Sequence, residues 1–394
     1  MKICLLHNLF GPFARGGAEV VAENIAEGFL ERGDEVVVIT TKPWLVSTDK
    51  YSGKFRVYFL GSFYYYLNKT PIFFRWFWHL CDSFDFITAY RIKKILQQER
   101  ADLVITNNLA GLSKLTPLFI SHSKIKQVHI LHDIQLLHPS GLILIGQENV
   151  INSWMAKIYQ GFNKYYCQQV ANVVSPSEWL LTLHQQRNFF PSAKKIILAN
   201  PIKVNLLRSR QEKTTASFKV LFVGQLEEHK GILFLLVSWQ EFRKSAGTNV
   251  FLEIIGDGGQ LATVKKASLT DTNIIVSGKL SRGEVVKKMS RSDLLVLPSL
   301  AYENYPSVII EAISQNLPVL AADLGGVPEI IKTYGGILFK PADQPSLLAE
   351  LEKIIKNPPL LEEIRNQYEQ IDFGRFSPSS YVKNLLSGIS QTHF

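Results

Sequence analysis

The chain has 394 residues, of which 46% are hydrophobic and 20% are charged. This length predicts two or three domains, and the composition argues against a disordered chain, a collagen-like repeat and a disulfide-rich scaffold. The three cysteines are far apart, which favours a reducing compartment and provides no zinc-ligand spacing. The N-terminal apolar run is too short for a signal peptide, and no uncharged apolar stretch is long enough to span a bilayer. We therefore expect a cytoplasmic protein.

The net charge of +9 belongs mainly to the first half of the chain. Residues 1–200 contain 21 Lys and Arg against 14 Asp and Glu, a balance of +7, whereas the remainder contains 22 against 20, a balance of +2. An anionic membrane face, an anionic substrate or nucleic acid would each suit such a balance, and solubility without a specific partner is the alternative.

Residues 63–77 are dense in aromatic side chains, and basic residues lie in or just beyond them. Rings with neighbouring cations suit peripheral contact with the inner face of a membrane. The alternative is a helix whose aromatic side chains lie in the core of the first domain.

The first half begins with an apolar strand at 2–7, a loop that ends in Gly16-Gly17, a helix at 18–32 and a second strand at 35–40. Further strands are expected at 102–106, 127–131, 172–175 and 195–199, with helices between several of them. Short apolar strands that alternate with helices predict a parallel sheet covered on both faces.

The same pattern restarts in the second half. A strand at 218–224, a polar loop with Gly231 and a helix through about Arg243 are followed by strands at 250–255, 273–276, 294–297, 319–322 and 336–339. Helices are expected near 282–291, 306–316, 326–332 and 345–356. We predict an α/β protein with two doubly wound parallel-sheet domains in tandem, joined near residues 201–215, whose strand ends face a central cleft. This arrangement favours an enzyme with one substrate per domain.

The strongest chemical signal lies in residues 298–312. Pro306 is expected to begin a helix, whose free N–H groups and dipole would bind phosphate. Glu303 lies before this helix and Glu311 lies within it, where their carboxylates would accept hydrogen bonds from hydroxyl groups. Phosphate donors between two hydroxyl-binding carboxylates indicate a nucleotide-sugar.

Three other sites carry weaker signals. Lys230 follows the first strand of the second half and would neutralise a diphosphate, although a solvated lysine is the alternative. Gly17 would let a helix N-terminus approach an anion, or would simply form a tight turn. His132 follows a strand and would bond a sugar hydroxyl or relay a proton, unless it is a structural histidine. The run at 255–259 lacks the third glycine of a dinucleotide fingerprint, which disfavours a dehydrogenase.

In chain order, these motifs resemble those of the retaining glycosyltransferases of family 4, which have the GT-B fold of two Rossmann-like domains. The resemblance covers nearly the whole chain: GGAE at 16–19, HD at 132–133, SPSEWL at 175–180, NP at 200–201, GQLEEHKG at 224–231, IGDGG at 255–259, SGKLSRGEV at 277–285, PSLAYENYPSVIIEA at 298–312 and NLPVLAADLGGVPEII at 316–331.

The resemblance implies an N-terminal acceptor-binding domain over 1–200, a nucleotide-sugar domain over 201–376 and a last helix within 377–394 that packs back on the first domain. It implies that Glu303, Lys230 and His132 are catalytic, with Glu303 at the sugar hydroxyls and Lys230 at the diphosphate. The implied donor-binding residues also include Gly17, Gln225, Leu280, Asn304, Tyr305, Ser307, Val308 and Glu311, with Glu311 at the ribose and backbone near Leu280 at the base. No metal and no cofactor are expected. Two positions depart from the family, which usually has arginine at Gln225 and often has glycine at Pro306.

The leading hypothesis is a retaining transferase that moves a hexosyl group from a nucleoside-diphosphate sugar to an acceptor hydroxyl in cell-surface polysaccharide or glycolipid synthesis. The expected partners are this donor and a saccharide or lipid-linked acceptor, with peripheral membrane contact through the first domain and no nucleic acid. A non-catalytic sugar-nucleotide-binding or scaffolding subunit is the alternative, and an epimerase that acts on the same donors is a third reading.

Overall fold

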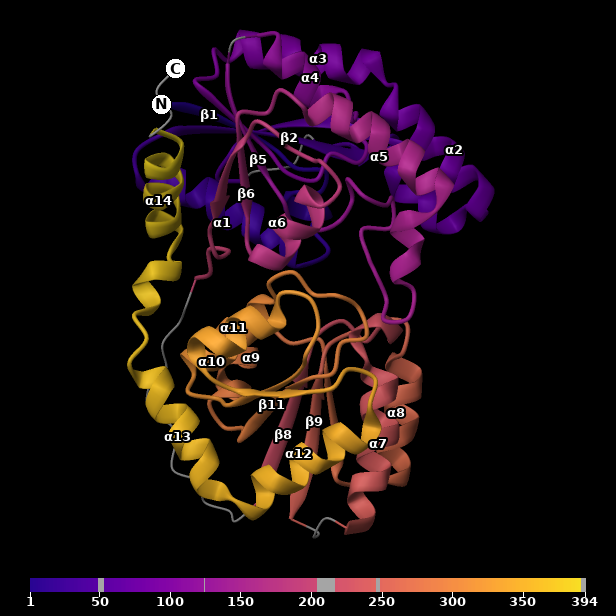
Figure 1. The fold of residues 1–394 in the computed structure, drawn as a ribbon, viewed down its shortest axis with the longest axis vertical. Coiled ribbons are helices and arrows are strands. Elements are labelled where there is room, and N and C mark those ends of the chain that lie inside the picture. The colour runs from indigo at the N-terminus through magenta and orange to yellow at the C-terminus, as the bar shows by residue number, and fades with distance from the viewer. Residues whose placement is uncertain (49–52, 124, 204–216, 246–248, 391–394) are drawn as a thin grey trace. The chain divides into compact units, whose positions relative to one another are not determined.

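The computed structural model describes residues 1–48, 53–123, 125–203, 217–245 and 249–390, which form two compact units (Figure 1). The first unit comprises residues 1–142, 149–203 and 374–394, and the second comprises 143–148 and 204–373. Most of the linker expected near 201–215 lies outside the described residues. Sequence reasoning placed residues 143–148 in the first domain, whereas in the structure they bond to a loop of the second unit.

The first unit is built on seven parallel strands in the order β3-β2-β1-β4-β5-β6-β7. Their bounds are β1 Lys2–Leu6, β2 Glu35–Pro43, β3 Arg56–Ser62, β4 Leu103–Thr106, β5 Lys126–Ile130, β6 Asn172–Ser175 and β7 Lys194–Ile197. Successive side chains of β1 face opposite sides of the sheet. Ile3 and Leu5 therefore pack in the core beneath α1 and α14, while Cys4 and Leu6 pack in the core beneath α3 and α4.

Helices cover both faces of this sheet, and α14 lies along α1 (Figure 1). The bounds are η1 Gly11–Phe13, α1 Gly17–Glu31, η2 Phe63–Lys69, α2 Ile72–Ser83, α3 Phe86–Gln98, α4 Thr116–Ser121, η3 Glu148–Asn152, α5 Trp154–Cys167, α6 Glu178–Gln185, η5 Phe373–Phe376 and α14 Pro378–Ser390. Tyr381, Val382 and Leu385 of α14 are buried in the α1 core. The last helix of the chain therefore completes the unit that the first residues begin.

The second unit is built on six parallel strands in the order β10-β9-β8-β11-β12-β13. Their bounds are β8 Phe218–Val223, β9 Val250–Ile255, β10 Ile274–Gly278, β11 Leu294–Leu297, β12 Val319–Ala322 and β13 Ile337–Phe339. The helices are η4 Glu228–Lys230, α7 Ile232–Ser245, α8 Leu261–Thr270, α9 Arg282–Met289, α10 Ser307–Ser314, α11 Val327–Tyr334, α12 Gln344–Lys356 and α13 Pro358–Glu369. Val220 and Phe222 of β8 share one core with buried residues of α7 and α12.

Both strand orders confirm the predicted doubly wound fold class for each unit. In each sheet the order reverses direction beside the first strand, between β1 and β4 in one unit and between β8 and β11 in the other. Ligands of such sheets bind outside the carboxyl ends of the strands at this point. The loops after β8 and β11 are therefore where the second unit is expected to bind its ligand.

Candidate functional site

The loops after β8 and β11 bring Lys230 and Glu303 together. The Lys230 Nζ lies 2.7 Å from the Glu303 Oε1, and the Ser299 hydroxyl donates to the same oxygen at 2.9 Å. The Lys230 and Glu303 side chains are 26% and 14% exposed. The pair is thus half-buried at the reversal point of the sheet and still accessible to a ligand.

Two glycines permit this contact, because neighbouring backbone leaves no room for a side chain. Gly231 has φ +74°, and a Cβ there would lie 1.8 Å from the Pro298 carbonyl oxygen. Gly325 has φ +67°, and a Cβ there would lie 2.3 Å from the Glu303 carbonyl oxygen. The Gly326 N–H donates to that same oxygen at 2.7 Å. The loop that carries Glu303 is therefore held by backbone on both sides.

The Glu303 carboxylate is ionised at neutral pH. Burial alone would raise its pKa, but the charge and hydrogen bond of Lys230, together with Ser299, outweigh burial and hold the pKa below its usual value. An ionised carboxylate accepts hydrogen bonds only, so this group suits hydroxyl donors.

The helix that follows Glu303 begins one residue later than expected. Pro306 is the N-cap of α10 with an extended ψ of 113°, and its carbonyl oxygen accepts from the Ile309 N–H at 3.1 Å. The Pro306 side chain makes no capping hydrogen bond, so the first N–H groups of the helix, including those of Ser307 and Val308, are not bonded by their N-cap side chain. Asn304 and Tyr305 lie in the loop between Glu303 and Pro306.

Glu311 lies in the second turn of α10 and pairs with a cation that sequence reasoning missed. The Arg282 Nη2 lies 3.1 Å from the Glu311 Oε1. Burial raises the pKa of Glu311, and Arg282 only partly opposes the effect. Arg282 begins α9, two residues after Leu280, so this pair ties the β10–α9 loop to α10.

The chain matches two family models that together span most of its length: "Glycosyltransferase Family 4" over residues 15–206 and "Glycosyl transferases group 1" over residues 204–370. The chain is a group 1 glycosyltransferase. A Klebsiella pneumoniae protein described as an uncharacterized 42.6 kDa protein in the cps region is 28% identical over 86% of this chain and 90% of its own. A Salmonella typhimurium lipopolysaccharide 1,2-N-acetylglucosaminetransferase is 25% identical over 47% of this chain and 53% of its own.

A solved structure of Anabaena HepE in complex with UDP has the same fold as this glycosyltransferase. It superposes with a TM-score of 0.73 at 17% identity over 100% of both chains. HepE has also been solved with UDP-glucose, and that structure superposes with a TM-score of 0.70. These neighbours and the two parallel sheets confirm the predicted GT-B fold class.

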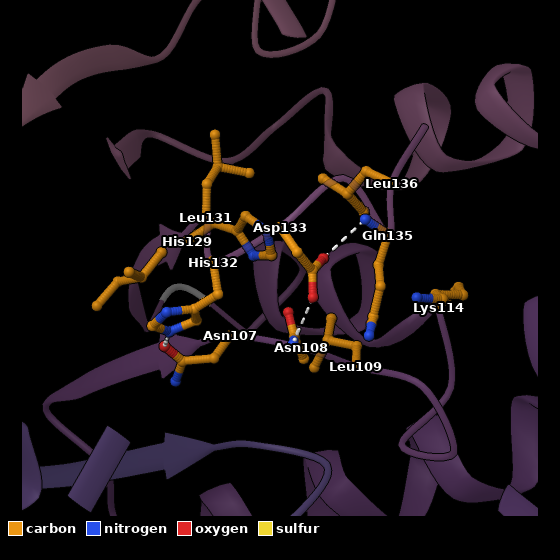
Figure 2. A pocket seen from close by; sticks show the side chains of 11 residues that line it. Asn107, Asn108, Leu109, Lys114, His129, Leu131, His132, Asp133, Gln135 and Leu136 are labelled. Carbon is orange, nitrogen blue, oxygen red and sulfur yellow. Dashed lines mark hydrogen bonds between the residues drawn. The ribbon is translucent and has the colours of Figure 1, made fainter. Parts of the chain in front are cut away.

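In the first unit of the glycosyltransferase, His132 lies in a small pocket at the carboxyl ends of β4 and β5 (Figure 2). Its Nε2 lies 2.8 Å from the Asn107 Oδ1, and burial lowers its pKa to about 3. The Asp133 carboxylate beside it accepts from the Asn108 side chain at 2.9 Å and from the Gln135 N–H at 2.7 Å. Figure 2 shows the Lys114 ammonium directed towards this side of the pocket. His132 is therefore neutral and oriented by Asn107, so it suits hydrogen bonding better than carrying charge.

Gly17 is exposed and begins α1 of the glycosyltransferase. A Cβ at Gly17 would meet nothing within 4 Å, so packing does not require glycine there. Gln225 is also exposed, in the loop after β8. The roles of both residues stay predictions.

Sequence reasoning placed Lys230, Glu303 and Glu311 on the correct elements of the glycosyltransferase but missed Ser299 and Arg282. Both missed residues lie inside motifs already singled out, so their polar side chains beside a predicted carboxylate were the available signal. Within the described residues there is no cluster of three or more His, Cys, Asp or Glu placed to hold a metal ion. None of the helices described there is long and apolar enough to cross a membrane.

Proposed function

We propose that this glycosyltransferase moves a hexosyl group from a nucleoside-diphosphate sugar to an acceptor hydroxyl with retention at the anomeric carbon. The observation that carries the proposal is the Lys230–Glu303 contact beside the uncapped end of α10. A cation, free N–H groups and an ionised carboxylate at one point of the sheet match a diphosphate joined to a hydroxyl-bearing sugar.

Each group has one role in this proposal. The Lys230 ammonium and the N–H groups of Ser307 and Val308 bind the diphosphate, and the backbone amides of Asn304 and Tyr305 contribute to the same site. Glu303 accepts hydrogen bonds from the sugar, and Glu311 accepts them from the ribose. Because Lys230 touches Glu303, one ammonium group links the leaving group to the carboxylate that orients the sugar.

The proposed reaction exchanges substituents on one face of the anomeric carbon. The bond from that carbon to the diphosphate oxygen breaks, and the bond to the acceptor oxygen forms on the same face. The acceptor proton passes to the departing diphosphate, whose negative charge Lys230 stabilises. The neutral His132 imidazole hydrogen-bonds a sugar hydroxyl, and the Gly17 N–H approaches the diphosphate.

We propose a saccharide or lipid-linked acceptor in cell-surface polysaccharide or glycolipid synthesis. The Salmonella typhimurium relative acts on lipopolysaccharide by its name, and HepE has been solved with UDP-glucose. The HepE complex supports a sugar-nucleotide donor, and the Salmonella typhimurium relative supports a surface glycan as product.

The donor proposal is tested by binding and by product stereochemistry. Purified protein is titrated with UDP, GDP and ADP and with their glucose and galactose esters, and thermal shifts identify the bound pair. Glu303→Gln should weaken only the sugar-nucleotide, whereas Glu311→Gln should weaken both the sugar-nucleotide and the free diphosphate. Glu350→Gln, which alters an exposed ion pair on α12, is the control. A product with inverted anomeric configuration by NMR would refute retention, and no shift with any ligand would refute the donor class.

We further propose that the first unit contacts an anionic membrane through α2, α3 and α5. Each helix has an exposed apolar face with helical spacing, and the three most exposed side chains are Phe73 at 75%, Trp154 at 72% and Ile87 at 68%. The other members are Phe74, Phe77, Leu80, Phe86, Tyr90, Ile158 and Tyr165. The alternative, that the aromatics of 63–77 lie in the core, is wrong for Phe73, Phe74 and Phe77.

The charges of these helices favour anionic lipid as the partner. Within the three helices there are six basic residues and one acidic residue, Asp82, which is 5% exposed. The basic residues are Arg75, Arg91, Lys93, Lys94, Lys157 and Lys164. Cations beside apolar side chains match the boundary between lipid headgroups and acyl chains.

Flotation with vesicles tests this contact. The protein should float with phosphatidylglycerol-containing vesicles, and less with phosphatidylcholine alone or at high salt. Phe73→Ser combined with Ile87→Ser should abolish flotation without lowering Tm, because both side chains are exposed. Leu269→Ser, at an 85% exposed position in the second unit, is the matched control. Flotation that is absent, insensitive to lipid charge, or unchanged in the double variant would refute the surface.

A further inference from the structure

Residues 143–148, called the strap below, belong to the second unit although the chain on both sides of them belongs to the first. Leu144 forms an antiparallel bridge with Ala301. The Ile145 N–H donates to the Leu300 carbonyl at 2.9 Å, and the Tyr302 N–H donates to the Ile143 carbonyl at 3.0 Å. The strap therefore pairs with the loop that leads directly into Glu303.

The other side of this loop is bonded to the β8–α7 turn. The His229 carbonyl oxygen accepts from the N–H groups of Leu300 and Ala301, at 2.9 and 3.1 Å. Residues 300–302 thus lie between the strap and the turn that carries Lys230, bonded on both edges as a central strand is. Of these two partners, the strap comes from the first half of the sequence and the turn comes from the second half.

A side-chain contact completes the pairing. The Tyr302 hydroxyl donates to the Glu148 Oε1 at 3.0 Å, and the Gly146 N–H donates to the same oxygen at 2.9 Å. Hydrogen bonds from backbone N–H groups and from Tyr302 hold the pKa of Glu148 below its usual value. Burial and the bond to Glu148 raise the pKa of Tyr302 to about 12. Donor and acceptor therefore keep one protonation state across neutral pH.

We infer that the strap positions Glu303 for the sugar, with Tyr302 and Glu148 as positioning residues of the donor site. The inference rests on the proposed function, in which Glu303 contacts the sugar and Lys230 contacts the diphosphate. Tyr302 is adjacent to Glu303 in the chain, so a shift of Tyr302 towards or away from the strap moves the carboxylate. Lys230 belongs to the turn that is bonded to the opposite edge of the loop. Loss of the strap contact should therefore weaken recognition of the sugar and spare recognition of the diphosphate.

The readout is the ratio of two dissociation constants, for UDP-glucose and for UDP, or for the equivalent pair that the wild-type protein binds. Tyr302→Phe and Glu148→Ala should each weaken the sugar-nucleotide three- to tenfold and leave the free diphosphate within a factor of two. The double variant should be no worse than Glu148→Ala alone, because that substitution already removes the Tyr302–Glu148 contact. Glu148→Gln keeps an oxygen acceptor for the Tyr302 hydroxyl and should restore the ratio.

Tyr368→Phe is the matched control, because it also removes a tyrosine hydroxyl bond in the second unit, to the Gly335 carbonyl at 3.1 Å. It should change Tm without changing the ratio. Equal weakening of both ligands, additive effects in the double variant, or a Tyr302→Phe ratio like that of Tyr368→Phe would overturn the inference. If the wild-type protein binds neither ligand the donor proposal itself fails, and if Glu303→Gln changes the ratio while the strap variants do not, only this inference fails.

Discussion

Replacement of Lys230 by methionine removes the cation of the donor site and retains most of the side-chain volume. The lost contact is a 2.7 Å charge-assisted hydrogen bond to a carboxylate that is only 14% exposed. Such bonds contribute about 1.5–3 kcal/mol, which corresponds to roughly a 10- to 150-fold loss in kcat/KM if the bond to the leaving diphosphate is of the same kind. Donor-hydrolysis or transfer kinetics with the preferred donor would measure the loss.

The second unit contains a matched pair that separates this effect from loss of stability. The Lys288 Nζ lies 2.6 Å from the Glu253 Oε1, which also accepts from the Ser277 hydroxyl at 2.7 Å. Lys288→Met therefore removes the same type of contact outside the donor site. Both variants should lose a few degrees of Tm, since about 1 kcal/mol corresponds to roughly 2–4 °C in a unit of this size. Only Lys230→Met should lose activity, and equal kcat/KM in the two variants would refute the role of Lys230.

The pH dependence of Lys230→Met gives an independent check. In the wild-type protein the pKa of Glu303 is lowered, so the stability that this carboxylate contributes is present above its unfolded pKa and is lost as pH falls through its folded pKa. Without Lys230, burial dominates and the pKa of Glu303 rises. On the acid side of the pH–activity profile, the fall in kcat/KM should therefore occur at higher pH in the variant than in the wild-type protein. An unchanged profile would contradict the argument.

Three other predictions concern separate features of the chain. Gln225→Arg adds a cation at an exposed position and should strengthen donor binding about tenfold by calorimetry, the equivalent of about 1.4 kcal/mol, whereas no gain would count against a diphosphate near this residue. Gly28→Ala would place a Cβ 2.3 Å from the Pro378 carbonyl oxygen and should lower Tm by several degrees in differential scanning calorimetry, whereas Gly17→Ala should leave Tm unchanged. A Gly28→Ala protein as stable as wild type would mean that α1 and α14 separate easily. Stability of the first unit in urea should fall between pH 6.5 and 4, because burial lowers the pKa of five histidines to about 3 or 4 and their unfolded forms take up protons in this range. Asp82 and Asp133, whose pKa values burial raises to about 6, act in the opposite direction but are only two, so equal stability at pH 7 and pH 5 would contradict these values.

Most of the fold could be predicted from the sequence because the central strands are uniformly apolar. The strand expected at 2–7 is β1 and the one at 218–224 is β8, while the last helix that the family resemblance implied within 377–394 is α14. The missed strand, β3, lies at the sheet edge, where four of its seven residues are half-buried and two are exposed. Edge strands lack the continuous apolar run that marks a strand buried on both faces.

The candidate site was most predictable where the chemistry is local in sequence. Glu303, Pro306 and Glu311 share one strand–loop–helix segment, so their approximate placement followed from one motif. The partners that pair with the two carboxylates, Lys230 and Arg282, come from 73 and 29 residues away, and only Lys230 was anticipated. The strap could not be predicted from the sequence, because no periodic pattern of apolar residues marks a six-residue segment that pairs with the second unit through backbone hydrogen bonds.

The position of α14 after the second unit in the chain has a consequence for synthesis. The apolar face of α1 emerges from the ribosome first, but the residues of α14 that cover it, Tyr381, Val382 and Leu385, are translated only after the whole second unit. During that interval the nascent first unit exposes a hydrophobic groove that chaperones can occupy. A polypeptide that terminates before α14 would keep this groove open permanently and should aggregate even though its donor-site residues are all present.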